Sequence, residues 1–173
     1  MLLCLRPLEP ADVPDFRRLA DDAAVAAAAL LDLPLTDAAA ERFIAEADRA
    51  AREGRLHLRA IVTEDRLAGC LLLEPSEDEA GTAELSYWVG APFRRRGIAT
   101  RAVTGCARLA RTLGFGQLTA TCLAQNSASR RVLEASGFAF AGRGTARPGP
   151  RLGPLPLPAL YYRASLARRP AAP

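Results

Sequence analysis

The run Arg-Arg-Arg-Gly-Ile-Ala-Thr at residues 94–100 combines three guanidinium groups with a glycine. It follows a strand-like segment at 82–89, rich in aromatic and branched residues, and leads into an amphipathic, helix-like segment at 97–113. The first turn of a helix has free N–H groups and a partial positive charge, and glycine lets a ligand approach the backbone closely. The run is therefore a candidate pyrophosphate site, although a plain surface connection would have the same pattern. Its candidate contacts are Arg94, Arg95, Arg96, Gly97, Ile98, Ala99 and Thr100.

A second polar segment, Asn-Ser-Ala-Ser-Arg-Arg-Val-Leu-Glu-Ala-Ser-Gly-Phe, occupies residues 126–138. It follows a short strand-like segment at 117–122. Asn126 is a good N-cap for a helix over 127–136, and Gly137 suits the left-handed position that ends such a helix. The apolar residues from Phe138 onward predict another strand directly afterwards.

At this point the chain resembles the GNAT acetyltransferases. Arg94-x-x-Gly97-x-Ala99 is similar to the acetyl-CoA pyrophosphate motif of that family. The segment at 126–138 resembles its second CoA motif, as found in the ribosomal-protein N-terminal acetyltransferases of the RimJ/RimL branch. The opening Leu-Arg-Pro-Leu at 5–8, followed by Asp12, is similar to the first strand and helix of that branch. The resemblance covers roughly residues 2–166, and the two motifs together, in order and suitably spaced, make it specific.

The resemblance implies a mixed α/β fold with a mostly antiparallel sheet flanked by helices. Its central strand, here 82–89, is expected to splay from its neighbour and admit the pantetheine arm of acetyl-CoA, the expected co-substrate. The expected reaction is direct attack of a primary amine, on a protein N-terminus or a small molecule, within a ternary complex. Trp88 and Val89 are expected beside the cofactor, with a backbone N–H near Val89 stabilising the oxyanion. Asn126 is expected to contact the pantetheine amides, and Arg130 to contact the 3′-phosphate.

Glu84 is the candidate general base, because it lies on the central strand about where the histone-acetyltransferase branch carries a glutamate. Strand alternation places it on one face with Ser86 and Trp88; a solvated strand glutamate is the competing interpretation. Ser129 matches the RimJ/RimL serine proposed to protonate the CoA thiolate, or it only satisfies a backbone N–H. Many other members use a tyrosine there, and the aligned residue in this chain is Leu133. No acid follows Glu134, which leaves the identity of the base open.

Charge is distributed unevenly along the chain. Residues 1–93 hold 18 acids and 9 arginines, whereas residues 94–173 hold 14 arginines and a single acid. Such asymmetry can mark a nucleic-acid partner. The phosphates of coenzyme A account for the basic half more economically, and the acidic half suits a cationic amine; a fortuitous dipole is the remaining interpretation. We therefore expect no nucleic-acid partner.

The chain lacks the motifs of several other classes of nucleotide-binding and metal-binding protein. The chain has no lysine, so it has no P-loop, and it lacks the Gly-x-Gly-x-x-Gly of dinucleotide folds. With one histidine and no Cys-x-x-Cys pair, no metal site is expected. A catalytically inactive acyl-CoA sensor or a basic-surface binding module remains the alternative, since neither needs Glu84 or Ser129.

Length and composition predict one domain over residues 1–167 and a frayed tail at 168–173. The four cysteines are expected to be reduced core residues of a cytoplasmic protein without a membrane segment. Final strands are predicted at 138–142 and 160–166, separated by an irregular, proline-rich loop at 143–158. The apolar segment Leu152–Leu160 is a candidate contact surface for a homodimer.

Overall fold

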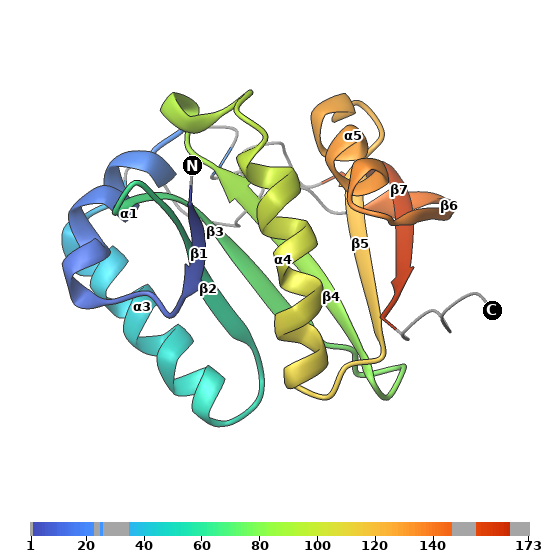
Figure 1. Cartoon of the computed structure of the whole chain (residues 1–173), viewed down its shortest axis with the longest axis horizontal. Helices are drawn as coiled ribbons and strands as arrows, with labels where there is room; N and C mark the ends of the chain where they lie inside the picture. The colour runs from blue at the N-terminus through green and yellow to red at the C-terminus, as the bar shows by residue number, and fades with distance from the viewer. Residues whose placement is uncertain (1, 23–24, 26–34, 147–154, 167–173) are drawn as a thin grey trace.

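A seven-stranded sheet runs through the molecule in the order β1-β2-β3-β4-β5-β7-β6 (Figure 1). The computed structural model describes residues 2–22, 25, 35–146 and 155–166. Every neighbouring pair of strands is antiparallel except β4 and β5, which are parallel. The predicted fold class, a mixed α/β domain with a mostly antiparallel sheet, is confirmed. The strands are β1 Leu3–Arg6, β2 His57–Thr63, β3 Arg66–Pro75, β4 Thr82–Val89, β5 Gln117–Leu123, β6 Ala139–Ala146 and β7 Leu157–Ser165.

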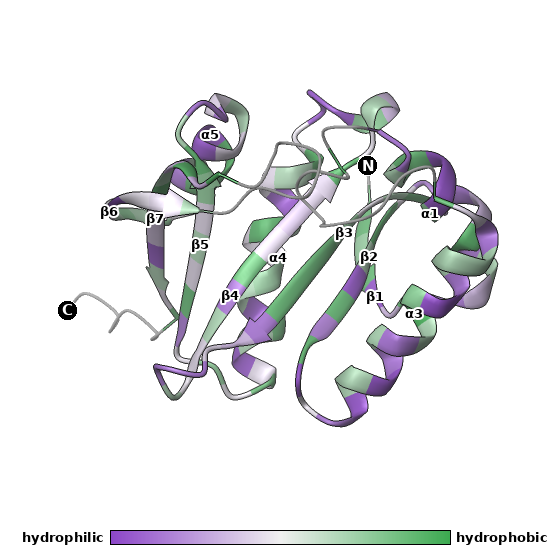
Figure 2. Ribbon diagram, turned by 180° about the vertical axis from the view of Figure 1, so that it is seen from behind, coloured by the Kyte–Doolittle hydropathy of each residue, from purple (hydrophilic) through white to green (hydrophobic). Residues whose placement is uncertain are grey.

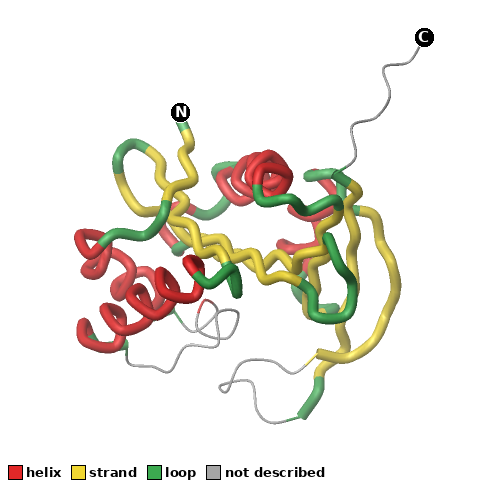
Figure 3. The backbone as a smooth tube through the Cα atoms, turned by 90° about the horizontal axis from the view of Figure 1, so that it is seen from below, coloured by secondary structure: helices red, strands yellow, loops and turns green. Residues whose placement is uncertain are grey.

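Helices cover the sheet on both faces, as the view along its edge shows (Figure 3). One face is covered by α4, which packs against β1, β3 and β4 and contacts α5. The opposite face is covered by α1 and α3, which pack against β3 and β2. The α-helices are α1 Val13–Ala20, α3 Asp37–Arg52, α4 Ile98–Thr112 and α5 Ser127–Ala135, with short 3₁₀ turns at Pro10–Asp12 and Ala91–Phe93.

Helix α3 is amphipathic and covers part of the sheet with its apolar face. Its N-cap is Thr36, whose hydroxyl oxygen accepts a hydrogen bond from the Ala39 N–H at 3.1 Å. Apolar residues recur at helical spacing and are buried, while the outer side carries charged residues. Figure 2 shows these alternating hydrophilic and hydrophobic bands along α3. The buried face is formed by Ala40, Ile44, Ala47 and Ala50.

An aromatic cluster ties this helical layer to the central strand. Phe16 of α1 stacks on Phe43 of α3, with ring centroids 5.4 Å apart. Phe16 also meets the ring of Trp88 on β4 edge-on, at 5.8 Å. Such pairs add a favourable geometric term to the burial of their large apolar area. The cluster therefore holds α1 and α3 at a defined position over β4.

The last two strands are longer than predicted. Residues 143–146 and 157–158 were expected in an irregular loop, but they belong to β6 and β7. Gly144 does not break the strand: a Cβ atom there would lie 2.5 Å from the Tyr161 hydroxyl, so the glycine makes room for that ring. Pro158 is tolerated because β5 pairs with β7 only from Ala159 onward, so no β5 partner needs its missing N–H.

Some expectations fall on residues that the structure does not describe. The tail at 168–173 and residues 152–154 of the dimer segment lie outside the described ranges, whereas residues 155–160 of that segment are described. Among the described residues, Cys70, Cys106 and Cys122 are buried as predicted, but Cys4 is exposed. The expectation for Cys4 was wrong because it lies on an edge strand, where only alternate residues are covered.

Two further observations concern the described part of the chain only. Its helices include none that is long and apolar enough to cross a lipid bilayer. Its histidine, cysteine and acidic side chains form no group of three or more that could hold a metal ion.

Asp12 anchors the first turn of the chain to β1. The Arg6 guanidinium donates two hydrogen bonds to its carboxylate, at 2.7 and 2.8 Å, and the Glu9 N–H donates a third at 2.8 Å. Burial alone would raise the pKa of Asp12, but these hydrogen bonds and the charge of Arg6 outweigh it and lower the pKa below its ordinary value. The ionised form is therefore the one that stabilises the fold.

Asp12→Asn is accordingly expected to lower the free energy of unfolding by about 1–3 kcal/mol at pH 7. Because the folded pKa is depressed, the stabilisation is present above the unfolded pKa of about 3.9 and is lost as pH falls through the folded pKa. Urea unfolding between pH 7 and pH 3 measures this. The matched control is Asp15→Asn, which removes an exposed ion pair with Arg18 and should cost less than about 1 kcal/mol. Equal losses for both variants would contradict the assignment.

Candidate active site

The turn between β4 and α4 has the geometry of an anion site. Gly97 is the N-cap of α4 and has a left-handed φ of +71°, and Arg95 is also left-handed at +60°. The first backbone hydrogen bond of the helix runs from the Arg101 N–H to the Gly97 carbonyl. The N–H groups of Ile98, Ala99 and Thr100 precede that bond, so no earlier helical carbonyl can accept from them. Those three groups and the helix dipole favour a bound anion at this end.

Of the three arginines of the turn, one is held by a hydrogen bond and an ion pair, and the other two are exposed. The Arg94 side chain bends back: its Nε donates to the Val89 carbonyl at 2.9 Å, and its guanidinium pairs with Asp22 at 3.1 Å. Arg94 thus fixes the turn against the end of β4. Arg95 and Arg96 are exposed at the mouth of the turn. They are the arginines placed to supply positive charge to a ligand, whereas Arg94 holds the loop.

The central strand separates from its neighbour as the family resemblance implied. Strand β4 pairs with β5 only at Thr82, Ala83 and Glu84, opposite Gln117–Thr119. From Leu85 onward β4 has ladder partners on β3 but none on β5. The V-shaped opening leads from Glu84 up to the anion turn, which follows the end of β4. A linear ligand bound at the turn can therefore extend along β4 into the sheet.

On the α5 side of this opening, three polar side chains come together. The Tyr87 and Ser129 hydroxyl oxygens lie 2.9 Å apart, and Tyr87 also lies 3.2 Å from the Ser129 carbonyl. The Asn126 side chain accepts from the Ser129 N–H at 3.0 Å, so it is the N-cap that the sequence predicted. Because the Asn126 side chain accepts the hydrogen bond from that N–H, the Ser129 hydroxyl is not needed to cap the helix and hydrogen bonds with Tyr87 instead.

Tyr87 is the residue whose role sequence reasoning missed. From sequence alone, Tyr87 and Trp88 form an aromatic pair on a strand, which could line an acceptor pocket but is more often core. Burial raises the pKa of Tyr87 to about 12, so its phenol remains a neutral hydrogen-bond donor at physiological pH. Leu133, at the position where many family members carry tyrosine, is fully buried in the core. A tyrosine hydroxyl is thus present, but it comes from β4 instead of α5.

Cys122 is the second residue that only the structure brings to this group. It lies on β5 beyond the last residue paired with β4, and it faces the same side as Tyr87. Burial raises the pKa of the Cys122 thiol, while Arg130 and a hydrogen bond with Ser129 oppose that effect. Arg130, expected at a phosphate, therefore lies near the thiol.

Glu134, the only acid in residues 94–173, accepts a hydrogen bond from the buried Tyr162 hydroxyl at 3.0 Å. Glu134 lies at the C-terminal end of α5, and Tyr162 is a core residue. The neighbouring Tyr161 is partly exposed, and its hydroxyl donates to the Thr145 carbonyl.

Glu84 lies on the opposite face of β4 from Tyr87, at the point where the two strands separate. Alternation along β4 puts Glu84, Ser86 and Trp88 on the α1/α3 side, as predicted. Glu84 is exposed, and its register partner on β3 is Glu74. The candidate base and the Tyr87–Ser129 pair therefore flank the opening from its two faces and do not contact each other.

A cavity of about 280 Å³ opens on the Glu84 side, between α1, α3 and the sheet. Its floor follows the strand register, with Leu58, Leu72 and Ser86 side by side across β2, β3 and β4. Aromatic and aliphatic side chains make up most of its lining, and Glu46 and Glu74 are its acidic members. The remaining described lining residues are Phe16, Phe43, Ala47, Leu56, Cys70, Leu71, Tyr87 and Trp88.

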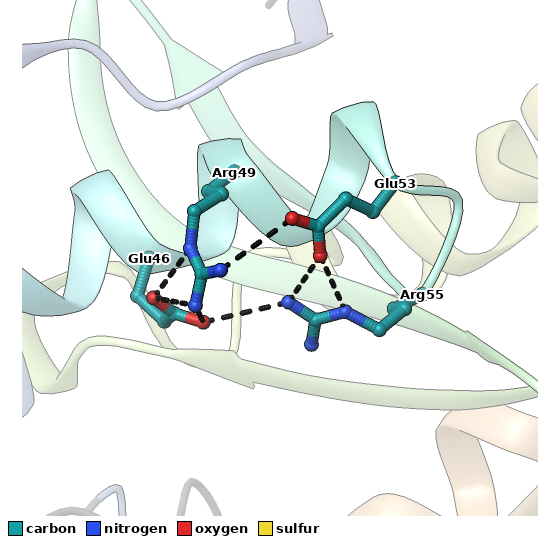
Figure 4. A network of polar contacts seen from close by, with 4 residues as sticks. All are labelled: Glu46, Arg49, Glu53 and Arg55. Carbon is teal, nitrogen blue, oxygen red and sulfur yellow. Dashed lines mark hydrogen bonds and ion pairs between the residues drawn. The ribbon is translucent and has the colours of Figure 1, made fainter.

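The Glu46 carboxylate is already paired within a four-residue network on the outside of α3 (Figure 4). Arg49 contacts Glu46 at 2.8 Å and Glu53 at 3.5 Å, while Arg55 contacts Glu53 at 2.6 Å and Glu46 at 3.5 Å. Hydrogen bonding to Arg49 is the main reason that the pKa of Glu46 is lowered. The charge of Glu46 is therefore balanced by neighbouring arginines.

The family model for the acetyltransferase (GNAT) domain matches residues 3–139. The chain belongs to the GNAT acetyltransferases. Comparison with functionally curated proteins gives no match. The β4–β5 opening and the turn before α4 are thus features of a GNAT enzyme, and the resemblance seen in the sequence is confirmed.

Solved structures share this GNAT fold at low sequence identity. MccE, a microcin C7 self-immunity acetyltransferase in complex with acetyl-CoA and AMP, has a TM-score of 0.80 at 16% identity, covering 94% of this chain and 92% of its own. RimL, a ribosomal L7/L12 alpha-N-protein acetyltransferase in complex with coenzyme A, has a TM-score of 0.77 at 20% identity, covering 94% of this chain and 93% of its own. RimJ from Mycobacterium smegmatis, in complex with a CoA disulfide, has a TM-score of 0.79 at 21% identity, covering 94% of this chain and 81% of its own.

Proposed function

We propose that this GNAT protein transfers the acetyl group of acetyl-CoA to a primary amine by direct attack within a ternary complex. The observation that carries the proposal is the opening between β4 and β5, which starts at an anion turn and has a carboxylate on one face and a hydroxyl pair on the other. Relatives with the same fold bind acetyl-CoA or coenzyme A, which supports the choice of cofactor.

In this proposal the cofactor is bound mainly by backbone groups of the turn before α4 and of strand β4. The pyrophosphate is assigned to the N–H groups of Ile98, Ala99 and Thr100, with charge from Arg95 and Arg96. The pantetheine arm then extends along β4, beside Trp88 and Val89. There the strand has no ladder partner on β5, and its polar groups can hydrogen bond to the pantetheine amides. Asn126 and Arg130 border the other side of the opening.

The chemical steps use groups on both faces of β4. Glu84 accepts a proton from the ammonium group of the acceptor. The neutral nitrogen attacks the thioester carbonyl, and a backbone N–H of β4 stabilises the resulting oxyanion. As the carbon–sulfur bond breaks, the nitrogen, which became cationic on attack, loses its second proton to solvent. The CoA thiolate takes the Ser129 hydroxyl proton, which Tyr87 replaces through its hydrogen bond to Ser129. After product release, Glu84 gives its proton to solvent and Tyr87 regains one.

The experiment that tests this function combines thiol release with binding. Acetyl-CoA is incubated with a panel of primary amines, including peptides with free N-termini. Released coenzyme A is measured, and the product is identified by mass spectrometry as the amine plus an acetyl group. Calorimetry with acetyl-CoA alone runs in parallel. Tight binding without thiol release for any amine would identify an acyl-CoA sensor, and absence of binding would overturn the proposal.

The Tyr87–Ser129 pair has its own expected signature. Ser129→Ala and Tyr87→Phe should each lower kcat by about tenfold, because a thiolate with a pKa near 8.5 is a tolerable leaving group without help. The double variant should lose no more than the worse single variant, since both remove the same proton path. Steady-state kinetics at pH 7 measures all three. Multiplicative losses would show that the two hydroxyls act independently and would contradict the relay.

A further inference from the structure

The cavity beside Glu84 has walls that select a particular kind of amine. On the assumption that the chain acts by the proposed acetyl transfer, we infer that its acceptor is a primary amine carrying an aliphatic or aromatic group. The apolar group occupies the cavity between α3 and the sheet, and the ammonium lies at the Glu74 and Glu84 end.

The first argument is that the side chains lining the cavity are mostly apolar. The floor of Leu58, Leu72 and Ser86 and the roof of Phe43 and Ala47 are apolar apart from the Ser86 hydroxyl, and the charged lining residues are Glu46 and Glu74. A polyhydroxylated acceptor would lose its hydration against these apolar walls with few hydrogen bonds in return. An alkyl or aryl group gains free energy from the same burial.

The second argument is the placement of charge. The register puts Glu74 directly opposite Glu84, at one end of the apolar floor. Within the described residues neither carboxylate forms an ion pair, whereas Glu46 is paired with Arg49 and Arg55. Glu74 is exposed at the edge of the cavity, and partial desolvation of its carboxylate, followed by the charge of Glu84, raises the pKa of Glu74. An ammonium group there supplies a cation to both carboxylates.

The third argument is size and position. A cavity of about 280 Å³ lies at the lower end of ligand pockets, so it suits one side chain or a small amine. Ser86, Tyr87 and Trp88 line both the cavity and the unpaired part of β4. An amine seated there therefore has its nitrogen next to the path assigned to the thioester.

The test uses a length series of amines: methylamine, propylamine, pentylamine and phenethylamine. A matched polar amine, 2-(2-aminoethoxy)ethanol, controls for length. KM should fall by about fourfold per added methylene until the cavity is filled, because each buried methylene is worth about 0.8 kcal/mol. The polar amine should resemble methylamine. Equal KM values across the series, with turnover intact, would overturn the acceptor assignment and leave the acetyltransferase function standing.

Binding is followed separately through Trp88, the single tryptophan of the chain, which lines the cavity. Pentylamine should change its fluorescence in a saturable way, in the absence of acetyl-CoA, and methylamine at the same concentration should not. A saturable change without thiol release for any amine would keep the cavity assignment and overturn the function. Absence of any change for all apolar amines would contradict the cavity assignment.

Glu74→Gln separates charge from shape. It should raise the KM for pentylamine by about tenfold and leave kcat and the affinity for acetyl-CoA unchanged. Glu77→Gln is the matched control: it removes an exposed acid three residues away that does not line the cavity, and it should leave all values unchanged. Equal effects of the two substitutions would show a general field of the acidic half and would contradict a specific contact.

Discussion

Gly97→Glu is expected to lower the affinity for acetyl-CoA at least about 100-fold while leaving the fold intact. The glycine is the N-cap of α4, and a Cβ atom built there meets nothing within 4 Å, so there is room for a side chain next to the N–H groups assigned to the pyrophosphate. A carboxylate in that space repels the phosphates and competes for the N–H groups of 98–100, each charge-assisted hydrogen bond being worth about 1.5–3 kcal/mol. Isothermal calorimetry with acetyl-CoA measures the loss.

Two controls separate charge from backbone strain. Gly97→Asn adds bulk without charge and tolerates a left-handed φ, so it should lose far less affinity than the glutamate. Gly114→Glu places the same residue at a left-handed glycine after α4, also in open space and away from the turn. Its affinity for acetyl-CoA should be unchanged. A folded Gly97→Glu protein with parental affinity would rule out the anion turn as the cofactor site.

Glu84→Gln is expected to lower kcat by roughly 10²–10⁴-fold without changing the affinity for acetyl-CoA. The amide cannot accept the proton that the ammonium must lose before attack. The loss should shrink as pH rises, because an alkylamine with a pKa near 10.4 is increasingly neutral and needs no base. For an α-amino group, with a pKa near 8, recovery should occur at correspondingly lower pH. Rate profiles between pH 6 and pH 10 measure both effects.

Comparison with Glu74→Gln makes this prediction specific. The two acids are register partners, so they experience similar surroundings, but only Glu84 is assigned to proton transfer. The Glu84→Gln substitution should therefore lower kcat, and the Glu74→Gln substitution should raise KM. A Glu84→Gln enzyme that turns over at the parental rate throughout the pH range would show that the base is water or another residue.

Much of the local structure could be predicted from residue pattern alone. The helix around 97–113 and the helix after Asn126 were found within two residues of their observed bounds, because amphipathic spacing, an N-cap and a terminal glycine act locally. The shared face of Glu84, Ser86 and Trp88 followed from strand alternation. Strands β6 and β7 were predicted too short, because the room that Gly144 makes for Tyr161 is a contact across strands and leaves no local signal.

The sequence by itself determined the family, the fold class and the position of the anion turn, since each depends on motifs and on short-range spacing. Only the tertiary structure decided that β4 and β5 part at Glu84, that Tyr87 meets Ser129 across 42 residues, and that Glu74 lies beside Glu84. These contacts depend on strand register and on the packing of α3 and α5, which are set by the sum of many distant apolar contacts. No single stretch of sequence encodes them.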